Sequence, residues 1–150
     1  MHIYEVATRR PELIQKLLQV WEASVRATHL FLSEAEILRI KEYVPQAIGG
    51  VAHLLVAEAE PDMPVGFLGV EDSRLEMLFL TPDARGHGLG KQLVELGIQK
   101  YGVREVTVNE QNPQAVGFYQ HIGFETYKRT DHDEEGGPYP LLYMKWKGEH

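Results

Sequence analysis

Hydrophobic residues in the first half of the chain follow two different periods, which predict strands and helices in alternation. A short apolar stretch at residues 3–6 predicts a strand, and apolar positions every three or four residues from Pro11 to about residue 29 predict a helix. Ser33 and Glu36 have the spacing of a capping box, so we expect a second helix that starts there and ends at Gly49-Gly50. Apolar stretches at residues 53–58 and 65–71, joined by a turn with two prolines, predict a hairpin.

The second half is built around an apolar run at residues 75–80, which predicts a buried strand that Thr81-Pro82-Asp83 ends. A glycine-rich turn and an amphipathic helix follow, and the apolar face of that helix carries Leu89, Leu93, Val94 and Ile98. The pattern then predicts a strand at 105–108, a helix from Asn112 to Gly123, and strands at 124–130 and 141–146. The order β-α-α-β-β-β-α-β-α-β-β predicts one mixed α/β domain over residues 1–150.

The composition is that of an ordinary globular domain. Of the 150 residues, 43% are hydrophobic and 25% are charged, and no apolar run approaches the ~18 residues that a membrane span needs. No signal or transit peptide is predicted, and the absence of cysteine fits a cytoplasmic protein. The net charge of −7 argues against a nucleic-acid partner, because phosphate contacts need clustered Lys and Arg. An acidic surface would tolerate a cationic ligand such as an amine.

The strand at 75–80, the turn RGHGLG at 85–90 and the next helix form an arrangement suited to binding an anion. Glycines let backbone N–H groups approach a ligand closely, and a helix start adds unpaired donors and a positive dipole end. Arg85 adds a formal charge, so the predicted ligand is a phosphate or pyrophosphate. A Walker A loop is excluded, because Arg85 and Gln92 stand where its first glycine and its hydroxyl residue belong. The glycines, at every second position, also lack the spacing of a dinucleotide fingerprint.

The pattern that remains, R-x-x-G-x-G, resembles the acetyl-CoA pyrophosphate loop of the GNAT (Gcn5-related N-acetyltransferase) superfamily. For this loop alone, a purely structural glycine-rich turn is the alternative. A second stretch, NPQAVGFYQHIGF at residues 112–124, is similar to the family's second signature, N-x-x-A-x-x-F-Y-x-x-x-G-F. Two motifs in the right order at the usual separation are far more specific than one. The SVRATHLFLS and PYPLL segments also resemble the YjaB-like group of small bacterial GNAT proteins.

This resemblance implies a GNAT fold, with a mixed and mostly antiparallel sheet of six to seven strands flanked by about four helices. It implies an N-acetyltransferase that moves the acetyl group of acetyl-CoA directly to an amine acceptor in a ternary complex. A cysteine acyl-enzyme is excluded, because the chain has no cysteine. The residues that the resemblance places at the cofactor are Leu78, Phe79, Leu80, Arg85, Gly86, His87, Gly88, Leu89, Gly90, Lys91, Asn112 and Tyr119.

By the same resemblance, Tyr119 is the candidate acid for the departing thiolate. A phenol with a reference pKa near ~10 stays protonated at pH 7 and is well matched to an alkylthiolate. The alternative is a structural tyrosine packed with Phe118. Asn112 is expected to cap its helix and to lie near the cofactor.

Two residues compete for the role of general base. Glu76 is a carboxylate on an otherwise apolar strand, so a cleft position with a raised pKa is expected, and a salt bridge with Arg74 is the alternative. His29 lies in the link between the first two helices, where the family places a lid over the acceptor pocket. Its ordinary pKa suits base chemistry, although a histidine in a loop can also be merely exposed. Phe31 is expected in the same lid as an acceptor contact.

The sequence leaves an alternative to the enzyme open. An acyl-CoA-binding sensor or interaction module with little catalysis is the alternative to an enzyme. No metal is expected, because His132 and its acidic neighbours are contiguous and typical of a solvated turn. The acceptor, a small-molecule or peptide amine, and the oligomeric state, monomer or homodimer, stay open.

Overall fold

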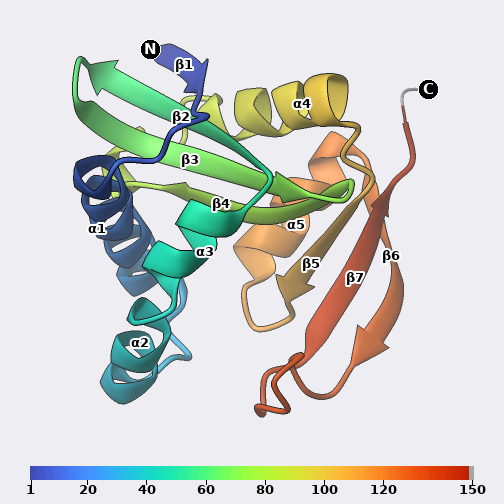
Figure 1. Ribbon diagram of the computed structural model, residues 1–150. Helices are drawn as coiled ribbons and strands as arrows, with labels where there is room; N and C mark the ends of the chain where they lie inside the picture. The colour runs from blue at the N-terminus through green and yellow to red at the C-terminus, as the bar shows by residue number, and fades with distance from the viewer. Residues whose placement is uncertain (149–150) are drawn as a thin grey trace.

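A sheet of seven strands runs through the computed structural model, which describes residues 1–148 (Figure 1). The strand order is β1-β2-β3-β4-β5-β7-β6, and neighbours are antiparallel except β4 and β5, which are parallel. The expected mixed and mostly antiparallel sheet is therefore confirmed. The strands are β1 (His2–Glu5), β2 (His53–Glu60), β3 (Met63–Glu71), β4 (Arg74–Leu80), β5 (Glu105–Asn109), β6 (Phe124–Thr130) and β7 (Leu141–Trp146).

Helices cover both faces of this sheet (Figure 1), and a separate hydrophobic core lies between each face and the helices that cover it. Strand β2 feeds both cores, because successive side chains of a strand point to opposite faces. Leu54 and Val56 belong to the core under α1 and α3, whereas Leu55 and Ala57 belong to the core under α4 and α5. The helices are α1 (Pro11–Thr28), α2 (Glu34–Lys41), α3 (Val44–Gly50), α4 (Leu89–Tyr101) and α5 (Pro113–Ile122).

The prediction of a single helix from Ser33 to Gly50 is wrong, because α2 and α3 are separate helices. The predicted cap is confirmed, since Ser33 Oγ accepts a hydrogen bond from the Glu36 N–H at 3.2 Å. Pro45 explains the break: it lacks an N–H group and fits only the first turn of a helix. The chain accordingly turns at Glu42 and Tyr43 and starts α3 with Pro45 in its first turn.

The sheet opens at β4. This strand pairs with β3 along its length, but the structure pairs it with β5 only through Arg74 and Leu75. Beyond that point β4 and β5 diverge (Figure 1). Opposite β3, Leu75 and Met77 face neighbouring residues, so Glu76 is the extra residue of a β-bulge. The expectation of a wholly buried strand is corrected here: Leu75 is buried, Glu76 is exposed, and the residues from Met77 onward are half-buried.

Between Leu80 and α4 the chain makes a single 3-10 turn, η1 (Pro82–Ala84), where the strand was expected to stop. Within residues 1–148, none of the helices combines the length and the apolarity that crossing a membrane requires.

The packing of α4 gives a stability prediction. Leu93 is fully buried between α4 and the sheet, so Leu93→Ala should lower the free energy of unfolding by about 2–5 kcal/mol through lost burial and a residual cavity. Leu38→Ala makes the same change on a side chain that is 48% exposed on α2 and should cost less than about 1 kcal/mol. Urea denaturation of both variants measures the difference. Equal losses would contradict the assignment of Leu93 to the core.

Candidate active site

A cavity of about 380 Å³ lies beside the part of β4 that has left β5. Its walls come from the end of β4, the loop at residues 85–91, α5 and the C-terminal end of α1. Most of the residues predicted for the site therefore meet around one space. Those that line it are Leu78, Phe79, Leu80, Arg85, Gly86, Gly88, Gly90, Lys91, Asn112, Tyr119 and His29.

The glycine-rich loop has the geometry that an anion site needs. Gly86 and Gly88 have φ angles of 78° and 80°, a region that other residues rarely adopt, and Gly88 is the N-cap of α4. Apart from the neighbouring residues of its own chain segment, no atom of residues 1–148 lies within 4 Å of where a Cβ on Gly88 would sit, so the space beside this backbone is open to a ligand. The first N–H groups of α4 have no partner inside the helix and carry its positive dipole end. A phosphate fits this loop.

Gly90 is needed for a different reason. A Cβ there would lie 3.2 Å from Cζ of Phe118, so the start of α4 packs directly against α5. The two motifs of the sequence, the loop and the NPQAVGFYQHIGF stretch, are thus in contact through one glycine and one aromatic ring.

Arg85 extends from the loop toward α1. Its Nη2 donates a hydrogen bond to Ser24 Oγ at 3.2 Å, and partial burial lowers the pKa of this guanidinium, which still leaves it charged. Ser24 is 3% exposed, so the contact lies inside the molecule. The predicted charge beside the loop is therefore present at the cavity.

Tyr119 is a buried residue of α5 that lines the cavity. Its ring is held edge-on against two others, Phe118 at a centroid distance of 5.0 Å and Phe124 at 5.6 Å. Burial raises the pKa of the Tyr119 phenol, because the ionised form would lose its hydration, so the hydroxyl keeps its proton at neutral pH. Asn112 caps the same helix as expected, its Oδ1 accepting a hydrogen bond from the Ala115 N–H at 3.3 Å.

His29 follows α1 directly and lines the same cavity. Its Nδ1 lies 2.9 Å from Thr28 Oγ1. Burial, and then the charge of Arg85, lower the pKa of His29, so the imidazole is neutral at pH 7. Phe31 does not line the cavity, but its ring contacts His29 at 5.4 Å and Tyr139 at 5.9 Å between centroids.

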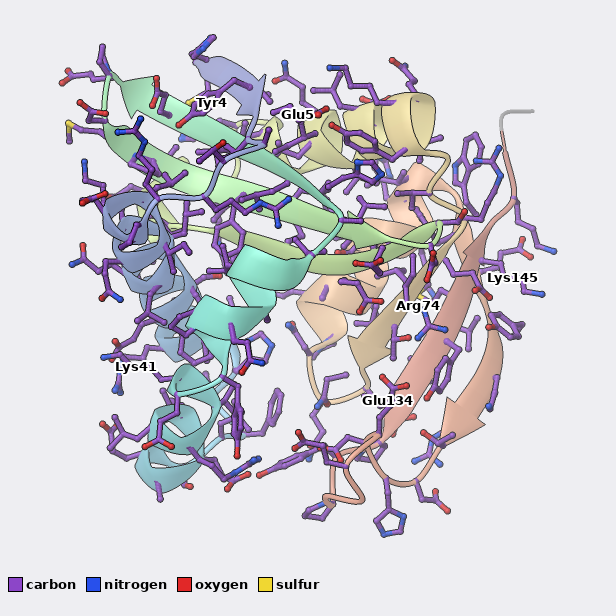
Figure 2. All side chains as sticks on the ribbon, viewed as in Figure 1. Tyr4, Glu5, Lys41, Arg74, Glu134 and Lys145 are labelled. Atoms are coloured by element: carbon purple, nitrogen blue, oxygen red, sulfur yellow. The ribbon has the colours of Figure 1, made fainter. Side chains whose placement is uncertain are left out.

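Glu76 sits outside this group. The bulge makes its side chain exposed, and it is not among the residues that line the cavity. Neighbouring groups still remove part of the hydration of this carboxylate, and that loss is the main cause of its raised pKa; Arg74 opposes the shift, while Glu134 and other acids add to it. Arg74 at the start of β4 and Glu134 in the β6–β7 turn lie close together (Figure 2), with Arg74 Nη1 3.9 Å from a Glu134 oxygen. His87 and Leu89 do not line this cavity; they line a second hollow, together with Val65 of β3.

Several residues of this site were not predicted from the sequence. Ser24 and Thr28 are the polar residues at the end of α1, and Phe118 and His121 bring a ring and a second imidazole from α5. Spacing could have pointed to Ser24 and Thr28, because residues four apart lie on the same face of a helix and both fall within the helix predicted from Pro11. Tyr139 carried no local signal, because it reaches Phe31 only through the tertiary fold.

Comparison with known proteins agrees with this geometry. The sequence profile of the Acetyltransferase (GNAT) domain family matches residues 27–146. The chain belongs to the GNAT acetyltransferase family. The expected N-acetyltransferase activity, with acetyl-CoA as co-substrate, is thereby confirmed at the level of the family.

Two curated relatives of this GNAT protein cover almost its full length. It is 44% identical over 135 residues to the peptidyl-lysine N-acetyltransferase YjaB of Salmonella typhimurium, across 90% of this chain and 92% of that protein. It is 39% identical over 151 residues to the protein of the same name from Escherichia coli, across 97% and 99%. The solution structure of apo-form YjaB from Escherichia coli superposes with a TM-score of 0.87 at 38% identity, covering 99% of this chain and all of that one.

The loop gives a binding prediction. Gly88→Val puts a branched side chain at a positive φ and fills the open space beside the loop, so the dissociation constant of acetyl-CoA should rise at least ~10-fold through lost charge-assisted hydrogen bonds. Gly117→Val is the matched control, because Gly117 is exposed on α5 with open space around it. Calorimetry on both folded variants provides the measurement. Unchanged affinity in folded Gly88→Val would show that the pyrophosphate binds elsewhere.

Proposed function

We propose that this GNAT protein acetylates a lysine side chain of a peptide or protein, in a ternary complex with acetyl-CoA. The observation that carries the proposal is the single cavity that joins the anion loop, Tyr119 and His29. The two relatives of 44% and 39% identity are both named peptidyl-lysine N-acetyltransferases, which supports this acceptor class. The absence of cysteine favours direct transfer over an acyl-enzyme on sulfur.

The donor is held by backbone as much as by side chains in this proposal. The pyrophosphate binds the N–H groups of the loop beside Arg85, and the pantetheine arm runs along the free edge of β4 at Leu78 and Leu80. Both residues line the cavity, and β5 does not pair with them. Amide groups of the arm would complete the hydrogen bonds that this strand edge leaves open. Such positioning supplies much of the rate enhancement in transfers of this kind.

Tyr119 and His29 take the two proton transfers. The protonated phenol of Tyr119 donates to the departing thiolate, and the neutral imidazole of His29 accepts the proton of the attacking amine. Both groups line the cavity, and the direction in which each pKa is shifted keeps each in the form that its role requires. Glu76 is the second candidate for the base, acting through water, because its raised pKa also brings it closer to the working pH.

The acceptor enters, in this proposal, past the aromatic residues next to His29. Phe31 and Tyr139 connect the end of α1 to the turn before β7, and a lysine side chain is long and apolar enough to pass along them. Two carboxylates lie beside Tyr139, and both pair with Arg39: Glu36 at 3.1 Å, which also accepts a hydrogen bond from Tyr139 at 3.2 Å, and Glu135 at 3.4 Å. Because two carboxylates share one guanidinium, this group keeps a net negative charge. A cationic side chain would be attracted to this rim.

Tyr119 tests the choice between an enzyme and a CoA-binding module. Tyr119→Phe keeps the ring and its contacts with Phe118 and Phe124, so stability and acetyl-CoA affinity should change little. Turnover of a lysine peptide should fall roughly 100-fold, the lower end for general acid catalysis. The assay follows release of CoA thiol, with Tyr127→Phe on the exposed β6 strand as control.

If Tyr119→Phe reacts at the wild-type rate in single-turnover experiments, in which product release does not limit the measured rate, Tyr119 has no role in the chemical step. Loss of acetyl-CoA binding together with turnover would favour the binding module. So would a wild-type protein that binds acetyl-CoA and acetylates no lysine peptide.

The pH profile separates the two candidate bases. Each acts in its deprotonated form, so kcat/KM rises with pH through the pKa of the base in the free enzyme. The limb does not by itself identify the base, because the pKa of Glu76 is raised from its usual value and that of His29 is lowered, which brings the two closer together. Its position is therefore uninformative, and the variants decide. We expect His29→Ala to abolish the limb and lower the rate ~100-fold, and Glu76→Gln to keep it. The reverse result would make Glu76 the base.

A further inference from the structure

The end of α1 holds a short chain of hydrogen bonds that leads into the cavity. Thr28 Oγ1 lies 2.7 Å from the Ser24 carbonyl oxygen and 2.9 Å from His29 Nδ1. A hydroxyl carries one hydrogen, and a carbonyl oxygen can only accept. Thr28 must therefore donate to Ser24, which leaves its oxygen as an acceptor toward His29. Nδ1 is consequently the ring nitrogen that carries the hydrogen.

From this arrangement we propose that Thr28 is a positioning residue, which holds the proton of His29 on Nδ1 and leaves the Nε2 lone pair for the acceptor amine. The inference rests on the acetyl transfer proposed above and adds to it the residue that prepares the base. In water, a free neutral histidine side chain prefers the opposite tautomer, with the hydrogen on Nε2. In that tautomer Nε2 has no lone pair to accept a proton. The hydrogen bond of the other nitrogen is what sets the tautomer.

Backbone contacts also hold Thr28 and His29 in place. Thr28 is the last residue of α1, where a threonine hydroxyl readily bonds the carbonyl four residues earlier. His29 is the C-cap, and its N–H donates to the Val25 carbonyl at 2.8 Å. Ser24 is buried and also receives the Arg85 hydrogen bond through its own hydroxyl. The ring is thus anchored to the same residue that receives the charged side chain of the loop.

The charges around His29 explain why a hydroxyl suits this position. Arg85 faces the ring from the loop, Lys91 and His121 line the same cavity from α4 and α5, and the neighbour on the α1–α2 link is the neutral Phe31. A carboxylate on Nδ1 would stabilise the imidazolium, whereas a hydroxyl orients the ring and leaves it neutral. Thr28 thereby orients the His29 ring without favouring its protonated form.

The step that follows is balanced. As the amine nitrogen attacks the thioester carbonyl, Nε2 takes one proton from it, the N–C bond forms and the C–S bond breaks. Tyr119 donates its proton to the leaving thiolate. The imidazolium then returns its proton to solvent, and Tyr119 regains one, so the protein ends unchanged.

The test compares Thr28→Val, which removes the hydroxyl and keeps the shape, with Thr28→Ser, which keeps the hydroxyl. Nitrogen-15 and carbon-13 chemical shifts of the His29 ring, measured above its pKa, report the tautomer directly. We expect Nδ1–H in the wild type and in Thr28→Ser, and a shift to Nε2–H in Thr28→Val. Turnover of a lysine peptide should fall at least ~10-fold in Thr28→Val, with unchanged acetyl-CoA affinity, and recover in Thr28→Ser. Thr126→Val, on the exposed face of β6, controls for the substitution itself.

Each outcome bears on a different statement. Nε2–H in the wild type would overturn the inference, and so would a Thr28→Val variant that changes tautomer without losing turnover. A wild type with Nδ1–H that acetylates no lysine peptide would contradict the proposed function and leave the tautomer assignment standing. Loss of turnover in Thr28→Ser as well as Thr28→Val, with the tautomer unchanged in both, would mean that Thr28 acts only through packing and would also overturn the inference.

Discussion

The site depends on how early β4 parts from β5. Pairing through Arg74 and Leu75 alone is enough to keep both strands in one sheet, and the bulge at Glu76 marks where it stops. Had the pairing continued, the next residues of β4 would be ordinary core. Because it stops, one edge of the strand keeps unpaired N–H and C=O groups inside an apolar wall. Such groups are costly unless a partner satisfies them, so an extended ligand with amide groups of its own is the natural complement.

Residues from distant parts of the chain line the cavity beside β4. The cationic and the anionic side chains of this region lie in different places. Arg85 and Lys91 line the cavity at the glycine-rich loop, whereas Glu36 and Glu135 lie outside the cavity lining, near Tyr139, and share Arg39. In the function proposed above, an anionic donor would therefore bind at the loop and a cationic acceptor would approach from the side of Tyr139. Two residues that line the cavity have pKa values shifted in opposite directions: burial keeps Tyr119 protonated, and burial beside Arg85 keeps His29 neutral.

The features that could be predicted from the sequence are those that a few neighbouring residues determine. The positive φ angles of the loop follow from its glycines, and the Ser33 and Asn112 caps follow from spacing. The break at Pro45 was missed because the apolar pattern continues through it. The position of Glu76 could not be predicted for another reason: a bulge depends on the register with β3, and it interrupts the regular alternation of side chains along the strand. Tyr139 needed the fold itself, since nothing nearby in sequence marks its contact with Phe31.

The contact between Gly90 and Phe118 couples the packing of the two motifs. A methyl group at position 90 would press on the Phe118 ring, and a smaller side chain at position 118 would leave a gap beside Gly90. Neither residue can therefore change freely alone. Phe118 is also the neighbour that holds Tyr119 edge-on. Substitutions on the two sides are therefore epistatic, and a library that seeks new acyl donors would have to vary position 90 and position 118 as a pair.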